Sequence, residues 1–385
     1  MRRSQYDQDH EDFRKVVRKF LENEIAPHFE EWEAAGIVPK DVYAKAGSIG
    51  LAGLSVPEEY GGGGIDDFRF NAVVIEETFR ARVGLGSLSL HSNIVTPYFL
   101  NFADEEQKRR WLPDIAAGRS MCSIAMTEPG TGSDLSGMVS NAVRDGDDWI
   151  LNGAKTFITG GINADLVVVA CRTSRGEDRR DGLSLLVVED GMPGFTKGRK
   201  LDKLGTRSVD TAELFFDNVR VPAANMLGEE GKAFGYLTFN LVPERLTQSV
   251  QSVAAARAAV ELAVEYTQQR KVFGKAVASF QNTKFVLAEC ATELEAAQTL
   301  ADKAVEEFNA GRLTVPEVAK VKLFTSETAG RIVDKCLQLH GGYGYMLEYP
   351  IARLYADIRL ARIAAGSSEI MKTAIAKSLG LGTSR

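Results

Sequence analysis

The stretch Ala125-Met-Thr-Glu-Pro-Gly-Thr-Gly-Ser-Asp-Leu-Ser-Gly137 decides how the rest of the chain is interpreted. The short apolar run from Cys122 to Met126 leads into it and predicts a β-strand that ends before Pro129. Gly130 and Gly132 permit positive φ, so that backbone N–H groups can approach a ligand closely. A polar turn between two strands is the simpler interpretation of such a loop. The glycine spacing and the β-rich sequence that follows argue against the strand–turn–helix fingerprint of dinucleotide-binding folds.

Composition places the chain among globular proteins of more than one domain. It has 385 residues, of which 44% are hydrophobic and 25% charged, and that length predicts two or three domains. The formal net charge of -6 offers no basic surface for nucleic acid. The four cysteines and four histidines form no metal-ligand spacing, so we expect no metal and a reducing compartment. The first residues lack the apolar segment of a signal peptide, and no apolar run could span a bilayer, so we expect a cytoplasmic protein.

Hydrophobic periodicity changes twice along the chain. Residues 1–120 carry helical spacing, for example from Phe13 to Ile25, and predict an N-terminal α-helical domain. Residues 121–229 contain short β-branched runs bounded by Gly, Asp and Pro, which predict a middle β-domain, either barrel or sandwich. Within it, Asn152-Gly153 lies between apolar runs and predicts a hairpin turn.

Helical periodicity returns over residues 230–385. Two long helices are expected over Val250–Gln269 and Phe280–Phe308, and a further helix begins near Pro316. We expect the last helix to begin near Tyr355. Long neighbouring helices predict a four-helix bundle, so that the fold class is α+β with three domains.

This order, with three motifs inside it, resembles the acyl-CoA dehydrogenase family over essentially the whole chain. The first motif is the loop quoted above, and the second runs from Gln338 through Gly341-Gly342 to Pro350. The third is Arg270-Lys-Val-Phe-Gly-Lys, followed by Phe280-Gln281. The resemblance implies FAD as cofactor and α,β-dehydrogenation of an acyl-CoA to the trans-2-enoyl-CoA, with flavin N5 accepting the hydride. It also implies a role in fatty acid β-oxidation and a homotetramer built as a dimer of dimers.

The resemblance assigns flavin contacts residue by residue. The Thr127 hydroxyl is expected at the pyrimidine part of the ring, Phe157 beside its face, and Arg270 at the pyrophosphate, where a guanidinium suits phosphate oxygens. Many members have Trp where Phe157 stands, and Phe keeps the apolar face but lacks the indole N–H. The stretch from Gln338 to Gly342 is expected to reach the FAD of a neighbouring subunit. The full set of expected flavin contacts is Ile124, Met126, Thr127, Gly132, Ser133, Phe157, Ile158, Thr159, Arg270, Phe273, Gln281, Gln338, Leu339, Gly341, Gly342, Ser367 and Glu369.

The catalytic base is where this chain departs from many relatives. Their glutamate precedes a Gly-Thr/Ser-Ser segment, but here Ala365 precedes Gly366-Ser367-Ser368 and cannot accept a proton. Long-chain and isovaleryl members place the base in an earlier Glu-Arg-Leu context, which Glu244-Arg245-Leu246 matches. An ordinary surface glutamate in a first helical turn is the alternative for Glu244, and Glu369 is the alternative base. We therefore predict Glu244 as the base.

Other residues of this region have supporting roles in the resemblance. The Ala365 N–H is expected to donate to the thioester carbonyl, because any residue except proline keeps that donor. Gly366 lets the thioester approach, and Ser133 and Arg245 complete the expected substrate contacts. An electron-transferring flavoprotein is the expected electron acceptor. The rival functions are an acyl-carrier-protein dehydrogenase, an oxidase or flavin N-hydroxylase of the same fold, and a non-catalytic flavin-binding subunit; chain length and branching stay open.

Overall fold

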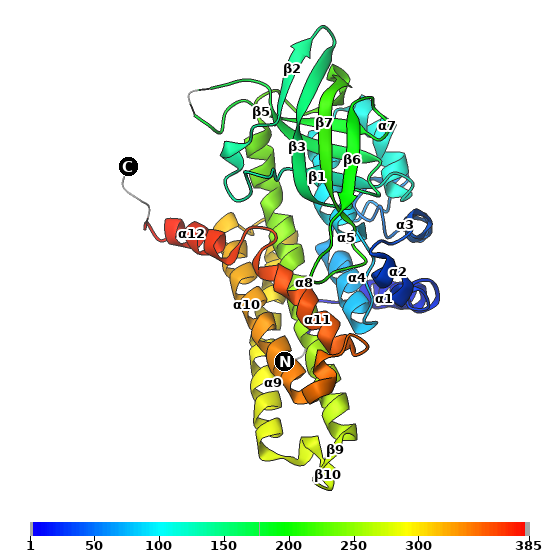
Figure 1. Ribbon diagram of the computed structural model, residues 1–385, viewed down its shortest axis with the longest axis vertical. Coiled ribbons are helices and arrows are strands. Elements are labelled where there is room, and N and C mark those ends of the chain that lie inside the picture. Colours follow the sequence, from blue (N-terminus) through cyan, green and yellow to red (C-terminus); the bar gives the residue numbers. More distant parts are fainter. Residues whose placement is uncertain (1–2, 177, 382–385) are drawn as a thin grey trace.

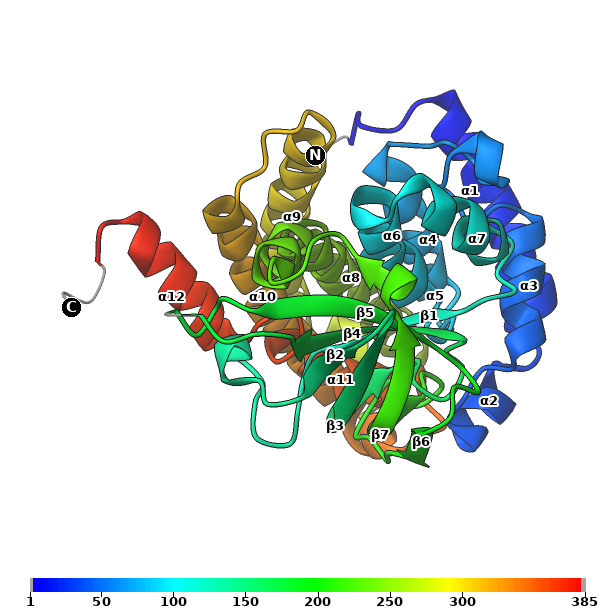
Figure 2. The same cartoon turned by 90° about the horizontal axis from the view of Figure 1, so that it is seen from above.

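A computed structural model describes residues 3–176 and 178–381 of the chain. Helices, then strands, then helices follow one another along the chain, and the sheet lies at one end of a long bundle (Figure 1). Seen from above, the N-terminal helices cover one side of the sheet, and the last helix points away on the other side (Figure 2). The predicted order of an N-terminal helical region, a middle β-region and a C-terminal helical bundle is thus confirmed.

The N-terminal region consists of helices whose ends follow ordinary capping rules. Asp104 caps α7 by accepting from the Gln107 N–H, while the Gln107 side chain accepts from the Asp104 N–H. Asp67 caps α4 in a similar way. The helices are α1 (Gln8–Phe20), α2 (Phe29–Ala35), α3 (Lys40–Ser48), α4 (Phe68–Arg80), α5 (Leu88–Leu90), α6 (Thr96–Phe102) and α7 (Glu105–Ala116).

The middle region forms an eight-stranded sheet in the order β6-β7-β3-β2-β4-β5-β8, with β1 pairing parallel to β4. Both faces of β4 are buried. Leu166 and Val168 pack toward the N-terminal helices, whereas Val167 and Val169 pack toward the rest of the sheet, as the two-residue period of a strand requires. The strands are β1 (Cys122–Ala125), β2 (Asn141–Asp145), β3 (Asp148–Thr159), β4 (Leu166–Arg172), β5 (Leu183–Glu189), β6 (Phe195–Lys200), β7 (Thr211–Pro222) and β8 (Met226–Leu227).

The hairpin predicted at Asn152-Gly153 is wrong. Strand β3 runs through both residues, and the turn between β2 and β3 lies at residues 146 and 147 instead. Gly153 serves a bulge in the pairing of β3 with β7. A Cβ at this position would lie 2.2 Å from the Ser140 Oγ. Glycine is therefore needed here because the Ser140 side chain lies close to the backbone, and not because the chain turns.

The C-terminal region is built on three long helices, which pack on one another along the long axis of the molecule (Figure 1). The prediction that the last helix begins near Tyr355 is wrong, because one helix spans that residue and ends at Ile358. Another helix begins at Ser368, since Gly366 has positive φ and Ser367 caps the new helix. The elements are α8 (Ala233–Gln269), β9 (Lys271–Val272), β10 (Lys275–Ala276), α9 (Gln281–Asn309), α10 (Val315–His340), α11 (Pro350–Ile358) and α12 (Ser368–Ser378).

In the part of the chain that the structure describes, no helix combines the length and apolarity needed to cross a membrane, and no group of His, Cys, Asp and Glu could hold a metal ion.

Candidate active site

The loop from Ala125 to Gly137 is fixed by a buried ion pair. The Lys155 Nζ lies 2.9 Å from the Glu128 Oε1 and donates to the Met126 carbonyl at 3.0 Å. Glu128 also accepts from the backbone N–H groups of Val139 and Ser140. Burial works to raise the pKa of Glu128, but these hydrogen bonds and the Lys155 charge outweigh it and lower the pKa. The carboxylate is therefore ionised, and it holds both ends of the loop in place.

The same loop meets the end of strand β3. The Thr156 N–H donates to the Thr127 carbonyl at 3.0 Å, and the Ser123 hydroxyl donates to the Thr159 carbonyl at 2.9 Å. These bonds bring Met126 and Thr127 beside residues 157–159. The structure thus assembles the two segments expected at the flavin ring.

The surroundings of this junction fit a flat aromatic cofactor. Phe157 is 68% exposed, although it is a large apolar side chain, and its φ of 59° holds it in the left-handed region. A Cβ built on Gly130 or Gly132 would meet no atom within 4 Å, so the loop borders open space. An exposed aromatic ring in a strained backbone beside an open glycine loop is typical of a ligand platform.

Helix α8 places Glu244 and Arg245 in its interior, near its third turn. Glu244 is partly buried, and within residues 3–176 and 178–381 its carboxylate has no hydrogen-bond partner. Burial raises the pKa of Glu244 to about 7, opposed only in part by the charges of Arg245 and Lys322. A carboxylate with a pKa near neutrality and no partner is suited to take and release a proton.

The turn at Ala365 and Gly366 is held by two cations from different helices. The Arg245 Nε donates to the Ala365 carbonyl at 3.4 Å, and the Lys322 Nζ of α10 donates to the Gly366 carbonyl at 2.8 Å. Ala365 has φ of 56°, an unfavourable conformation for alanine. Its own N–H has no acceptor in the described part of the chain and is free to donate to a ligand.

Three further residues expected to contact flavin or substrate are Ser367, Glu369 and Ser133. Ser367 caps α12 by accepting from the Ile370 N–H at 3.4 Å, and Glu369 is exposed in the first turn of that helix. Ser133 is exposed in the glycine loop and lines a cavity together with Phe234 and Leu241 of α8. The lining of this cavity on α8 ends at Leu241, three residues before Glu244.

The other expected flavin contacts lie at the far end of α8. Arg270 follows the last residue of α8, and its guanidinium lies 5.4 Å from the centre of the Tyr343 ring, so Arg270 and the 341–345 turn are neighbours. Phe273, in the turn between β9 and β10, is 95% exposed. Arg270 is 26 residues beyond Glu244, which corresponds to about 39 Å along a helix. Figure 1 shows β9 and β10 at the opposite end of the molecule from the sheet. The structure therefore does not bring all expected flavin contacts together within one chain.

A second cavity lies between α4, the 84–93 stretch and α8. Gln248, Gln251 and Ala255 of α8 line it on the same helical face as Glu244, at spacings of four, seven and eleven residues. Its other walls include Ile75, Leu88 and Ala361. The lining that α8 contributes therefore begins one helical turn beyond Glu244.

Sequence reasoning missed three residues of this site. Glu128, Lys155 and Lys322 all form buried polar contacts that hold its loops. A signal for Lys322 was present, because it occupies an apolar-face position of α10 between Val318 and Ala329. A lysine on such a face, fully buried, needs a partner, which the 366 carbonyl provides.

Comparison with known proteins agrees with this geometry. The chain matches family models described as acyl-CoA dehydrogenase N-terminal domain over residues 7–119, middle domain over residues 123–219 and C-terminal domain over residues 231–380. The chain belongs to the acyl-CoA dehydrogenase family. It is 44% identical to the mitochondrial long-chain specific acyl-CoA dehydrogenase of Sus scrofa over 375 residues, covering 97% of this chain and 87% of that protein.

Solved structures of the family superpose closely. An acyl-CoA dehydrogenase from Geobacillus kaustophilus matches with a TM-score of 0.95 and 48% identity, covering 97% of this chain and 98% of that one. A glutaryl-CoA dehydrogenase from Mycobacterium smegmatis, solved in complex with FADH2, matches with a TM-score of 0.90 and 31% identity, covering 99% and 96%. As a member of this family, the chain is an oxidoreductase that acts on CH–CH bonds.

Proposed function

We propose that this acyl-CoA dehydrogenase uses FAD to convert an acyl-CoA to its trans-2-enoyl-CoA, with Glu244 as the base. The observation that carries the proposal is the Glu244 carboxylate, whose pKa is raised to about 7 and which has no hydrogen-bond partner in the described part of the chain. Its neighbour Arg245 contacts the turn at Ala365, whose N–H has no acceptor among the same residues. Glu369 is a weaker candidate for the base, because it is exposed and its pKa is lowered, mainly by hydrogen bonds at the start of α12.

Each residue has a distinct task in this proposal. Glu244 removes the α proton, and the Ala365 N–H donates to the thioester oxygen as negative charge develops there. Arg245 and Lys322 do not react. They hold the carbonyls of residues 365 and 366, so that the free N–H keeps its direction.

The described residues fit FAD in two separate places. Thr127, Phe157 and the glycine loop border the ring position, and Arg270, Gln281 and the residues from Gln338 to Gly342 suit its phosphates and adenosine. When bound, FAD supplies a hydride acceptor for the β hydrogen. Since about 39 Å of helix separates Glu244 from Arg270, the second group must serve the flavin of another copy of the chain. A homo-oligomer follows from this proposal, and a tetramer is the family's usual form.

The domain limits 1–120, 121–229 and 230–385, the cytoplasmic location and an electron-transferring flavoprotein as acceptor are part of the same proposal. The flavoprotein would take electrons from the reduced enzyme. If molecular oxygen rather than the flavoprotein accepts the electrons, the protein is an oxidase of the same fold.

Anaerobic mixing of the purified protein with a panel of acyl-CoA esters tests the function. We expect roughly one FAD per chain and bleaching of its visible absorbance, with formation of the enoyl-CoA. Arg270→Ala should weaken FAD binding, because a charged hydrogen bond contributes about 1.5–3 kcal/mol. Lys284→Ala, an exposed residue of α9, is its control. A protein that binds FAD but is bleached by no acyl-CoA would contradict the proposal, and so would a monomer that turns over.

A further inference from the structure

The cavity between α4, the 84–93 stretch and α8 has a mostly apolar lining, but a cluster of amides and hydroxyls interrupts it. Side-chain amides and hydroxyls of Asn71, Ser89, Asn93, Gln248 and Gln251 line it, in addition to apolar residues. They come from three different segments, namely α4, the 84–93 stretch and α8. Binding pockets generally carry few polar groups, and those present fix the orientation and identity of the ligand.

These polar groups are contiguous. The Gln251 Nε2 and the Asn93 Nδ2 both donate to the Ser89 hydroxyl, at 3.3 and 3.4 Å. Both distances are long for an amide donor, whose usual separation is about 2.9–3.0 Å. One hydroxyl therefore holds two amides loosely, and each amide retains further donor and acceptor capacity.

Two more amides of the lining are without partners. In residues 3–176 and 178–381, the side chains of Gln248 and Asn71 form no hydrogen bond, although neither is fully exposed. Gln248 lies one turn from Glu244 and Gln251 two turns from it, so they are about 6 and 10.5 Å further along the helix. An acyl chain reacting at Glu244 and extending along α8 would pass both.

An alkyl chain in this position would displace water from the amides without forming hydrogen bonds to them. Amides buried without hydrogen bonds are costly, so a plain hydrocarbon is penalised here. An acyl chain with an oxygen atom at this depth would instead satisfy them. The amides can both donate and accept, so hydroxyl, oxo and ether groups are all suitable.

The charge of the lining selects a neutral group. Glu33 and Asp357 are the ionisable residues among the described residues that line the cavity, and both are acids. They accept from the backbone N–H groups of Ser208 and Thr206. Because no cation lines the cavity, a terminal carboxylate would lose its hydration without a counter-charge.

We propose that the preferred substrate is an acyl-CoA whose chain carries a neutral oxygen function, a hydroxyl or oxo group, several carbons beyond the reacting bond. Gln248 and Gln251 are the specificity-determining residues, with Asn71, Ser89 and Asn93 completing the polar wall. This inference rests on the proposed function, because it presumes an acyl-CoA substrate positioned by Glu244.

The test compares pairs of saturated acyl-CoA esters of equal length, one unsubstituted and one with a single hydroxyl, which is moved along the chain. The measured quantity is the ratio of their kcat/KM values for anaerobic flavin reduction. In the unmodified enzyme we expect a position at which the hydroxylated ester is favoured by tenfold or more, on the order expected when a site hydrogen-bonds its substrate. The ester with a terminal carboxylate should be a poor substrate.

The double variant Gln248→Leu/Gln251→Leu should reverse the ratio, because the leucines remove the groups that hydrogen-bond the substrate oxygen and add apolar surface. Gln268→Leu, an exposed residue of the same helix, is the matched control and should leave the ratio unchanged. The ratio in the unmodified enzyme tests the inference even where the double variant does not fold.

The two proposals fail in different ways. If unsubstituted esters reduce the flavin as well as hydroxylated esters at every position, the inference is wrong while the proposed function stands. If the double variant folds and keeps the ratio of the unmodified enzyme, the two glutamines do not set specificity. If no acyl-CoA reduces the flavin, the proposed function fails and the inference fails with it.

Discussion

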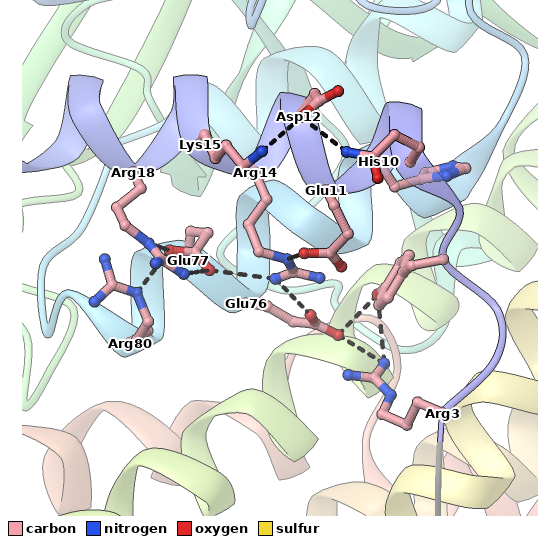
Figure 3. A network of polar contacts seen from close by, with 12 residues as sticks. Arg3, His10, Glu11, Asp12, Arg14, Lys15, Arg18, Glu76, Glu77 and Arg80 are labelled. Atoms are coloured by element: carbon pink, nitrogen blue, oxygen red, sulfur yellow. Dashed lines mark hydrogen bonds and ion pairs between the residues drawn. The ribbon is translucent and has the colours of Figure 1, made fainter.

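Glu77, which is buried, and Glu244, which is partly buried, have opposite electrostatic environments. Glu77, in α4, is 2% exposed and forms ion pairs with Arg14, Arg18 and Arg80 at 3.2, 3.0 and 2.6 Å. Figure 3 shows these guanidinium groups converging on it from α1 and α4. Glu244 has two cations nearby, but both donate to the backbone of residues 365 and 366 rather than to the carboxylate.

The pKa values of the two carboxyl groups follow from this difference. Burial works to raise the pKa of Glu77, yet the hydrogen bonds from Arg18 and Arg80 outweigh it and lower the pKa. Burial of Glu244 is not compensated in this way, and its pKa rises to about 7. A fully paired carboxylate stabilises the fold but is inert, whereas an unpaired one costs stability and can exchange a proton.

The first prediction removes the unpaired carboxylate. Glu244→Gln should lower the rate of anaerobic flavin reduction by roughly 10²–10⁴-fold, the contribution usual for a general base, and should keep FAD bound. Stopped-flow absorbance with a good acyl-CoA measures this rate. Glu77→Gln is the matched control, because it makes the same change at a carboxylate that lines neither cavity. An unchanged rate in Glu244→Gln would move the assignment of the base to Glu369.

The second prediction removes the paired carboxylate. Glu77→Ala should destabilise the protein by about 3–5 kcal/mol, since it leaves three arginines without their shared partner. Thermal or denaturant unfolding measures the loss. Glu22→Ala is the control, because Glu22 is the exposed partner of Arg80 and such pairs contribute about 0–1 kcal/mol. A loss of no more than about 1 kcal/mol in Glu77→Ala would show that the network is not a source of stability.

The third prediction concerns the stability of Glu244→Gln, which should increase where that of Glu77→Ala decreases. At pH 8, Glu244→Gln should be more stable than the unmodified protein, by up to about 3 kcal/mol, because the folded protein no longer holds an ionised carboxylate at a site that disfavours it. Toward pH 4.5 the folded protein carries a neutral group there and the unfolded chain also takes up the proton, so the difference should shrink to less than about 1 kcal/mol. Unfolding midpoints at the two pH values measure it. A destabilised Glu244→Gln at pH 8 would indicate that the carboxylate has a partner after all.

The fourth prediction concerns Lys322, which positions the turn. Lys322→Met leaves the Gly366 carbonyl without its donor, and a lost hydrogen bond to a charged group corresponds to about 1.5–3 kcal/mol. We expect flavin reduction to slow by roughly 10–100-fold, with FAD content and KM little changed. Lys322→Arg should restore part of the rate if the donor is what matters. Lys320→Met, an exposed position two residues earlier, is the control.

The fifth prediction, with the smallest expected effect, concerns the pH dependence of kcat/KM. Glu244 must be ionised to act as a base, so kcat/KM should rise with pH through about 7 and level off above it. Stability should change in the opposite direction, since the folded protein binds this proton more tightly than the unfolded chain between pH 4.5 and about 7. Steady-state rates between pH 5.5 and 8.5 measure the first trend. A flat profile would contradict the raised pKa.

The sequence by itself determined the family, the order of the three regions and the identity of the base candidate. These follow from local features: the spacing of apolar residues, the glycines of the 125–137 loop, and Ala365 with Glu244-Arg245 in place of the usual glutamate. The hairpin turn predicted from Asn152-Gly153 is wrong. The glycine is required by a tertiary contact with Ser140 and not by a turn.

Only the tertiary structure decided how these residues are used. A lysine in α10, far along the chain from residue 366, is brought to its carbonyl by helix packing, which no local pattern specifies. The length of α8 separates Glu244 from Arg270, so the flavin contacts divide between two places. The pKa of Glu244 likewise depends on what lies around it, because desolvation and unmade hydrogen bonds are properties of the packed molecule and not of the residue.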